Sequence, residues 1–160
     1  MYNEASGLVN KDVMHEIMDI EKEKHLVDAW LTAIRAGGSS SIYEANWWAI
    51  EAFMELPSED PELLWKSILI ALEKEDDLKV LGVLAAGPFE DLMCQYGEKI
   101  IDRVEEEAKN NPKFIPFMQG VLLSSEDTTV WKRFYELAGI EPPFPEEYRP
   151  IEEYERSKKS

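Results

Sequence analysis

Two adjacent carboxylates are the clearest candidates for chemistry in this sequence. Glu90 and Asp91 follow an apolar run that stops at Gly87 and Pro88. Two carboxylates act as general acid and base when both reach one reacting atom. Neighbouring residues on a helix point about 100° apart, so this pair does not converge. We therefore expect a capping role, in which Gly87 starts a helix and both acids meet the positive end of its dipole.

A pocket near the same turn is the alternative interpretation. Glu90 would line it, with Asn46 and Tyr96 beside it, and the protein would be an enzyme or a small-ligand binder. Converging carboxylates and a raised pKa of Glu90 would favour this role. A Glu90 side chain that faces solvent and contacts only its own helix end would exclude it.

A tryptophan among carboxylates is the second candidate site. Helical spacing places Glu44 at i−4, Glu51 at i+3 and Glu55 at i+7 from Trp48. An indole ring can anchor a protein partner or accept a cation on its face, and the acids pair with Lys or Arg. An acidic stripe on a later helix would extend the same surface, and it consists of Asp91, Glu98, Asp102 and Glu105. The alternatives are a Trp48 covered by the first helix or the tail, and an ordinary solvated face for the stripe.

Metal, cofactor and thiol chemistry have weak support. Four residues near the N-terminus share metal-ligand spacing: Asp12, His15, Glu16 and Asp19. A di-metal carboxylate bundle needs a second motif of this kind, which the sequence lacks, so we expect no metal and no cofactor. Cys94 has no His or basic neighbour to activate it, and we expect a buried or half-buried apolar side chain there. Nucleotide-binding, hydrolase and zinc-protease motifs are also absent from the sequence.

Charge and composition restrict the partners. The chain has 160 residues and a net charge of −16, and residues 51–110 hold 16 acids against 6 bases. Such a surface repels nucleic acid and anionic membranes and attracts cationic partners. No apolar stretch approaches the roughly 20 residues of a membrane span, and the N-terminal residues do not form a secretory signal. A single cysteine fits a reducing compartment, so we expect a cytoplasmic protein.

The candidate residues must be positioned by helices, because nearly every segment has helical periodicity. The first predicted helix spans residues 10–36, with a break near the charged residues 21–24, and the second spans 41–56 and ends before Pro57. A third helix spans 61–75 after an Asp60 cap, and a buried helix spans 78–86. The remaining predicted helices are 88–110, a short helix from Pro112, and 126–138, which Gly139 ends. In the second helix, Ser41 and Glu44 have capping-box spacing. Its expected inward stripe is Ile42, Ala45, Asn46, Ala49, Phe53 and Leu56, with Trp47 on the core flank and Asn46 bonding a neighbouring helix end.

The predicted fold class is all-α. We expect a compact array of about seven short helices, arranged as a HEAT-like α-α superhelix, with an irregular helical bundle as the alternative. One helical domain would occupy residues 1–139, and residues 140–160 would form a Pro-rich tail with acidic and basic residues.

The stretch around the acidic pair also carries a resemblance. LAAGPFEDL, followed by QYGEKIIDRVEEEA and NPKF, resembles a bacterial family of small all-helical proteins of unknown function that share an L-A-A-G-P-x-E-D-L motif, a glycine and an acidic helix. Three further blocks, EANWWAIEAF, DPELLWKSI and VWKRF, extend the likeness over roughly residues 26–138. The resemblance implies an all-helical fold and supplies no activity.

The sequence therefore favours a non-enzymatic protein-binding module with a basic protein partner. A specific form of this hypothesis is an immunity or inhibitor protein that neutralises a basic toxin domain. Two other classes stay open: the enzyme or ligand binder with a pocket near Gly87 and Pro88, and a structural or regulatory subunit with a self-associating face. Oligomeric state does not follow from the sequence.

Overall fold

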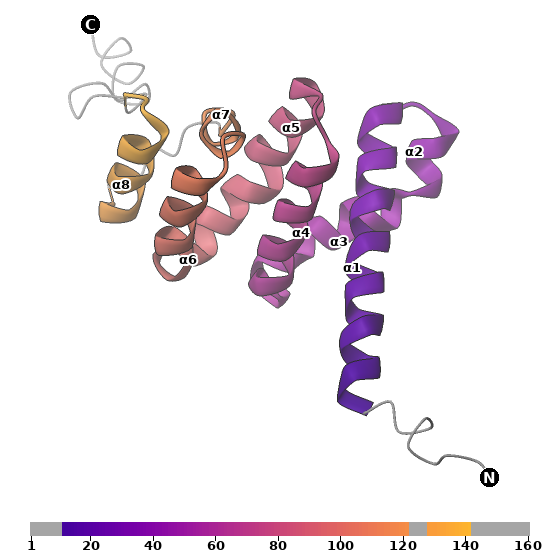
Figure 1. Ribbon diagram of the computed structural model, residues 1–160. Helices are drawn as coiled ribbons and strands as arrows, with labels where there is room; N and C mark the ends of the chain where they lie inside the picture. The colour runs from indigo at the N-terminus through magenta and orange to yellow at the C-terminus, as the bar shows by residue number, and fades with distance from the viewer. Residues whose placement is uncertain (1–10, 122–127, 142–160) are drawn as a thin grey trace, which may run out of the picture. The chain divides into compact units, whose positions relative to one another are not determined.

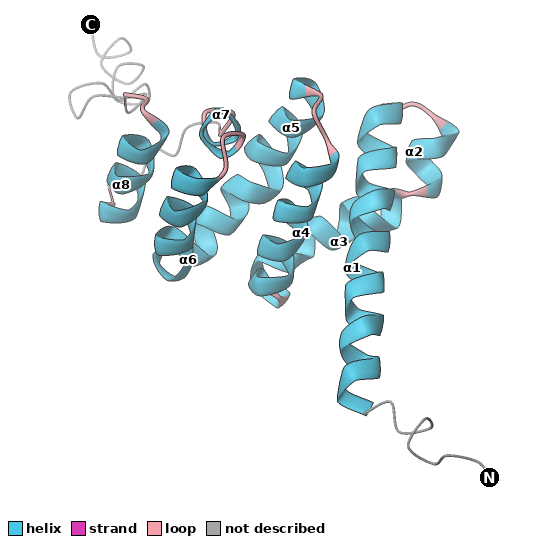
Figure 2. Cartoon of the chain, in the orientation of Figure 1, coloured by secondary structure: helices cyan, strands magenta, loops and turns pink. Residues whose placement is uncertain are grey.

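The computed structural model describes residues 11–121 and 128–141, and side chains from Asp19 onward. Every regular element in these ranges is a helix, as Figure 2 shows, which confirms the all-α prediction. The elements are α1 (Lys11–Ala36), α2 (Ser41–Ala45), α3 (Trp47–Glu59), α4 (Pro61–Lys74), α5 (Leu78–Leu84), a π-helical turn (Ala85–Phe89), α6 (Glu90–Asn110), α7 (Phe114–Met118) and α8 (Thr129–Ala138) (Figure 1). The chain forms two compact units, Met1–Leu84 and Ala85–Ser160, which are described separately below. The single domain and the superhelix stay predictions, and the tail beyond residue 141 lies outside the described residues.

Helix α1 runs without interruption, so the expected break at residues 21–24 is wrong. The Glu and Lys residues there are good helix formers, which explains the continuity. The helix stops at Gly37, whose positive φ of 83° suits a residue without a Cβ.

The second predicted helix is two helices with a break at Asn46. The cap of α2 is Ser40 rather than Ser41, because the Ser40 hydroxyl accepts a hydrogen bond from the Tyr43 N–H at 3.1 Å. Asn46 then has a non-helical backbone, and its Nδ2 donates to the Ile42 carbonyl at 2.9 Å. Helix α3 also continues past Pro57 to Glu59, one turn further than predicted. Pro57 has no N–H to donate to the helix, but it is buried, so its packing favours the continuation.

The core of the first unit forms where α1, α3 and α4 pack together. Trp30 of α1 stacks on Phe53 of α3, with ring centroids 5.2 Å apart. Leu64, Ile68 and Leu72 of α4 are fully buried at four-residue spacing. The predicted start of α4 is confirmed, because an Asp60 carboxylate oxygen accepts from the Leu63 N–H at 3.1 Å and Pro61 occupies the first turn.

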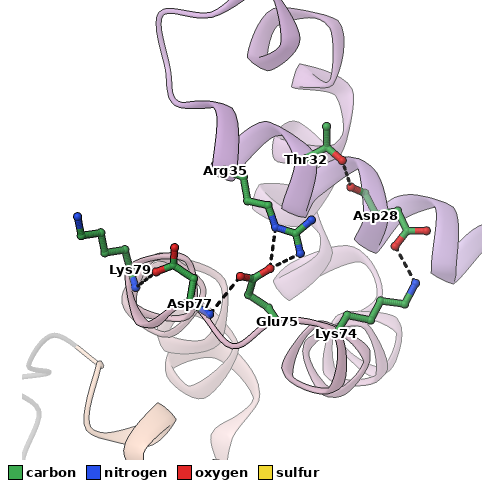
Figure 3. A network of polar contacts seen from close by, with 7 residues as sticks. All are labelled: Asp28, Thr32, Arg35, Lys74, Glu75, Asp77 and Lys79. Carbon is green, nitrogen blue, oxygen red and sulfur yellow. Dashed lines mark hydrogen bonds and ion pairs between the residues drawn. The ribbon is translucent and has the colours of Figure 1, made fainter.

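Two ion pairs join α1 to the C-terminal end of α4, as Figure 3 shows. Arg35 donates from Nε to Oε2 of Glu75 at 2.7 Å and from Nη2 to the same oxygen. The other carboxylate oxygen of Glu75 accepts from the Asp77 N–H at 3.1 Å. Lys74 Nζ contacts the Asp28 carboxylate at 2.7 Å. The buried Glu75 thus links α1 to the connection between α4 and α5.

Between Leu78 and Asn110 the backbone is helical throughout. The predicted helix start at Gly87 is therefore wrong: Phe89 has helical angles and makes no side-chain cap. A π-helical turn at Ala85–Phe89 replaces it. Pro88 has no N–H to give to an α-helical ladder, and the wider turn accommodates it. The segment before the turn is only partly buried, since Leu78 and Val83 are exposed.

The π-helical turn holds Phe89 in the core of the second unit. Phe89 is fully buried, and its ring centroid lies 4.9 Å from that of Phe117 and 5.9 Å from those of Phe114 and Phe134. Aromatic pairs of this kind contribute about 0.5–1.5 kcal/mol each beyond their buried area. This cluster explains why the chain stays helical through a Gly-Pro sequence.

Helix α8 packs closely against α6. A Cβ added at Gly97 would meet Cγ1 of Val130 at 3.0 Å, so the absence of a side chain permits the approach. Arg133 of α8 donates to Asp102 at 2.7 Å and to Glu105 at 2.5 Å on α6. Gly139 ends α8 with a φ of 68°, as predicted.

Candidate functional site

Exposed apolar side chains concentrate on α2 and α3. Of the eight large hydrophobic residues that are exposed in the described part of the chain, four lie between residues 42 and 54. They are Ile42, Trp47, Trp48 and Met54. Together with the exposed Glu44, Glu51 and Glu55 they form what we call the α2–α3 surface. Clustered apolar exposure of this kind marks interaction sites more often than single exposed residues do.

The two tryptophans of this surface are almost equally exposed but have different neighbours. Trp48 is 44% exposed, and its ring stacks on His25 of α1, with centroids 5.2 Å apart and planes inclined by 29°. Helix α1 thus covers part of Trp48. Trp47 is 43% exposed and does not lie in the core, so the expectation for it is wrong. Its ring lies 5.8 Å from that of Tyr43, with an angle of 50° between the planes.

The break at Asn46 explains this exposure. It separates α2 from α3, so one helical stripe cannot extend from Ile42 to Leu56. Ala49, Phe53 and Leu56 are buried as predicted, whereas Ile42 and Ala45 are exposed. The Asn46 side chain bonds the Ile42 carbonyl one turn before it, rather than the end of a neighbouring helix as expected.

The segment that forms the α2–α3 surface contains acidic residues and no basic ones. From Ala36 to Trp65 the sequence has six acidic residues and no Lys, Arg or His. The side-chain carboxylates of Glu44, Glu51 and Glu55 make no hydrogen bond or ion pair within the described residues. Their carboxylates are therefore available to a cationic partner.

The acidic pair on α6 is not a helix cap, because the chain is already helical before it. Glu90 is half-buried, and burial, together with the neighbouring charge of Asp91, raises its pKa. Asp91 is exposed, and partial desolvation raises its pKa too. These shifts show that ionising either carboxyl is less favourable than in water.

The three residues of the predicted pocket do not form one cluster within a unit. Asn46 belongs to the first unit, and Glu90 and Tyr96 belong to the second. On α6, a spacing of six residues separates Glu90 and Tyr96 by about 120° around the helix. The half-buried Tyr96 instead has Lys99 over its ring, with Nζ 5.3 Å from the centroid.

The acidic stripe of α6 is partly neutralised by the chain itself. Asp102 is exposed but binds Arg133, and Glu105 binds both Arg133 and Lys109. These contacts lower the pKa of Glu105, mainly through the hydrogen bond from Arg133. Asp91 and Glu98 remain exposed without an ion pair in the described residues.

The described residues offer neither a metal site nor a membrane-spanning helix. Among the described side chains, no three His, Cys, Asp or Glu residues are grouped so that they could hold a metal ion. The side chains of Asp12, His15 and Glu16 lie outside that description. Cys94 is exposed, contrary to the expectation of at least partial burial. None of the described helices combines the length and apolarity that a membrane crossing requires.

A comparison with protein families gives a match to part of this chain. The model of a family of unknown function (DUF6869) matches residues 36–139. The chain belongs to this family. The match includes the α2–α3 surface, the π-helical turn and all of α6, α7 and α8. No curated protein and no solved structure matches the chain.

Membership of DUF6869 agrees with the resemblance to a family of unknown function, although the matched region starts later than residue 26. The motif proposed for the family and its bacterial source stay predictions. Because the family has no known activity, function must be argued from the chain's own residues.

Proposed function

We propose that this protein is a non-enzymatic binding module that captures a basic protein through its α2–α3 surface. The main support for the proposal is that exposed tryptophans lie beside carboxylates that have no ion-pair partner in the described residues. Trp47 and Trp48 lie beside Glu51 on one helix, in a stretch without any basic residue. Tryptophan is among the residues most enriched at energetically important interface positions.

The charge of the whole chain supports the same partner class. A net charge of −16 attracts a cationic protein over distances up to the Debye length, about 8 Å at physiological salt. Attraction of this kind accelerates association and weakens as salt increases. Neutralisation of a basic toxin domain by an immunity or inhibitor protein is the specific form of the proposal.

The test compares capture from a lysate of the source cell by wild type and two charge variants. Glu51→Gln/Glu55→Gln removes two charges from the α2–α3 surface. Glu73→Gln/Glu136→Gln removes two exposed charges elsewhere and serves as the control. Circular dichroism establishes that both variants keep the helical content of wild type.

A single basic protein should be captured by wild type and by the control at low salt. It should be lost from Glu51→Gln/Glu55→Gln and weakened for wild type at high salt. Equal capture by both variants would show that the surface is wrong. Salt-insensitive capture, or no basic protein at all, would overturn the proposal of electrostatic binding.

A second candidate function is binding of a small ligand beside the π-helical turn. Single π-helical turns within α-helices occur frequently at functional sites. The half-buried Glu90 directly after the turn has a raised pKa, which is the property expected of a functional carboxyl. Asn46 is not required for this version of the site.

The titration of Glu90 tests this candidate. NMR should show a side-chain pKa of Glu90 above the usual glutamate value, and Asp91→Asn should lower it by removing the neighbouring negative charge. A Glu90 that titrates normally in wild type would remove the observation on which the candidate depends.

A further inference from the structure

The rings of Tyr43 and Trp47 form an open aromatic corner on the α2–α3 surface. Their centroids are 5.8 Å apart and their planes are inclined by 50°, so the rings are tilted rather than stacked. Tyr43 is half-buried, whereas Trp47 is 43% exposed. The break at Asn46 lies between them, and the corner therefore connects the end of α2 to the start of α3.

Exposed glutamates occur next to this corner in the sequence of both helices, but only the one on α3 shares a side of its helix with an aromatic ring of the corner. Glu44 follows Tyr43 in α2, and Glu51 lies one turn after Trp47 on the same side of α3. Both residues are exposed, and their carboxylates form no hydrogen bond or ion pair within the part of the chain described. An aromatic face combined with a carboxylate attracts a cation more strongly than either group alone, because both interactions favour positive charge.

The Trp48 ring is a weaker candidate for binding such a cation. Its exposed fraction equals that of Trp47 within one percentage point, but its ring already stacks on His25. The two neighbouring tryptophans are thus matched in type and exposure and differ in what their rings contact.

We propose that the Tyr43–Trp47 corner binds an arginine side chain of the basic partner, with Glu51 pairing with its charge. Arginine fits better than lysine because a planar, weakly hydrated guanidinium stacks on aromatic rings and donates two parallel hydrogen bonds to a carboxylate. This inference rests on the proposed function, since it names the group through which the basic partner is held.

The test uses defined peptides and the full chain. Peptides of alternating glycine and arginine, glycine and lysine, or glycine and citrulline are titrated into the protein by isothermal titration calorimetry. The variants are Trp47→Leu, the conservative Trp47→Phe, and the matched control Trp48→Leu. Both positions are at the surface, and circular dichroism checks that the helices persist.

Wild type should bind the arginine peptide more tightly than the lysine peptide, and about two- to five-fold more tightly than Trp47→Leu binds it, the range expected for an exposed cation–π contact. The citrulline peptide should bind much more weakly than either. Trp47→Leu should lose the preference for arginine, whereas Trp47→Phe and Trp48→Leu should keep it. A wild type without the preference, or an equal loss in Trp47→Leu and Trp48→Leu, would overturn the assignment.

The same variants separate this inference from the proposed function. If the lysate protein depends on Glu51 and Glu55 but binds Trp47→Leu as well as wild type, the surface is correct and the arginine corner is wrong. If no basic protein is captured, the proposed function fails, whatever the peptides show.

Discussion

Arg35→Met should destabilise the protein more than the equivalent change at a neighbouring ion pair. Arg35 and Lys74 both connect α1 with the end of α4, and methionine retains most of the apolar length of either side chain. The two pairs differ in burial. The Glu75 side chain is 8% exposed and that of Arg35 49%, whereas those of Lys74 and Asp28 are 35% and 59% exposed.

The size of the difference follows from this burial. Breaking a fully buried pair costs about 3–5 kcal/mol, because the remaining charge lacks compensation. An exposed pair contributes about 0.2–1 kcal/mol. Since Arg35 is half exposed and Glu75 is buried, we expect Arg35→Met to cost about 2 kcal/mol and Lys74→Met about 0.5 kcal/mol. Arg35→Met/Glu75→Gln should recover part of the loss, because a buried amide costs less than a buried carboxylate.

Urea unfolding followed by circular dichroism measures these costs. With a slope of about 2 kcal/mol per M, Arg35→Met should lower the midpoint by about 1 M and Lys74→Met by about a quarter of that. Equal shifts for the two single variants would refute the argument that the buried Glu75 carboxylate makes its ion pair the stronger connection. So would a double variant that is less stable than Arg35→Met alone.

Three further predictions concern the second unit. Gly97→Leu should lower the free energy of unfolding by about 2 kcal/mol in urea, because its side chain must displace Val130. Glu90→Gln should be more stable than wild type at pH 7, because the raised pKa of Glu90 means that its ionisation disfavours the folded state. In thermal unfolding, this stability advantage should disappear below about pH 4, where Glu90 is protonated in wild type too. Arg133→Met should lower the melting temperature at pH 7, and the loss should fade with salt and as the pH falls through the lowered pKa of Glu105.

Features set by short-range chemistry could be predicted from the sequence. The Asp60 cap with Pro61 in the first turn and the Gly139 stop each depend on a few neighbouring residues, and both are present. The buried spacing of Ala49, Phe53 and Leu56 also follows from one helix alone. These positions need no knowledge of distant segments.

Features set by distant packing could not be predicted. Gly87 and Pro88 carry the local signal of a helix start, but the aromatic cluster around Phe89 keeps the chain helical there. The exposure of Trp47 depends on the break at Asn46, for which the sequence gives only one polar residue in an apolar stripe. The acids at residues 44, 51 and 55 are identifiable from their spacing, whereas the Tyr43–Trp47 contact depends on how α2 and α3 meet at the break between them.

The distribution of the five tryptophans gives the protein a built-in set of optical probes. Trp30 and Trp65 are buried in the first unit and Trp131 in the second, so each unit contains an indole whose emission should shift to the red when that unit unfolds. Trp47 and Trp48 already contact solvent and should account for most of the emission that iodide or acrylamide quenches in the native state. Loss of this quenchable fraction without a red shift would therefore report occupation of the α2–α3 surface, while a red shift would report unfolding. Intrinsic tryptophan fluorescence with a quencher can thus distinguish binding from denaturation without any added label.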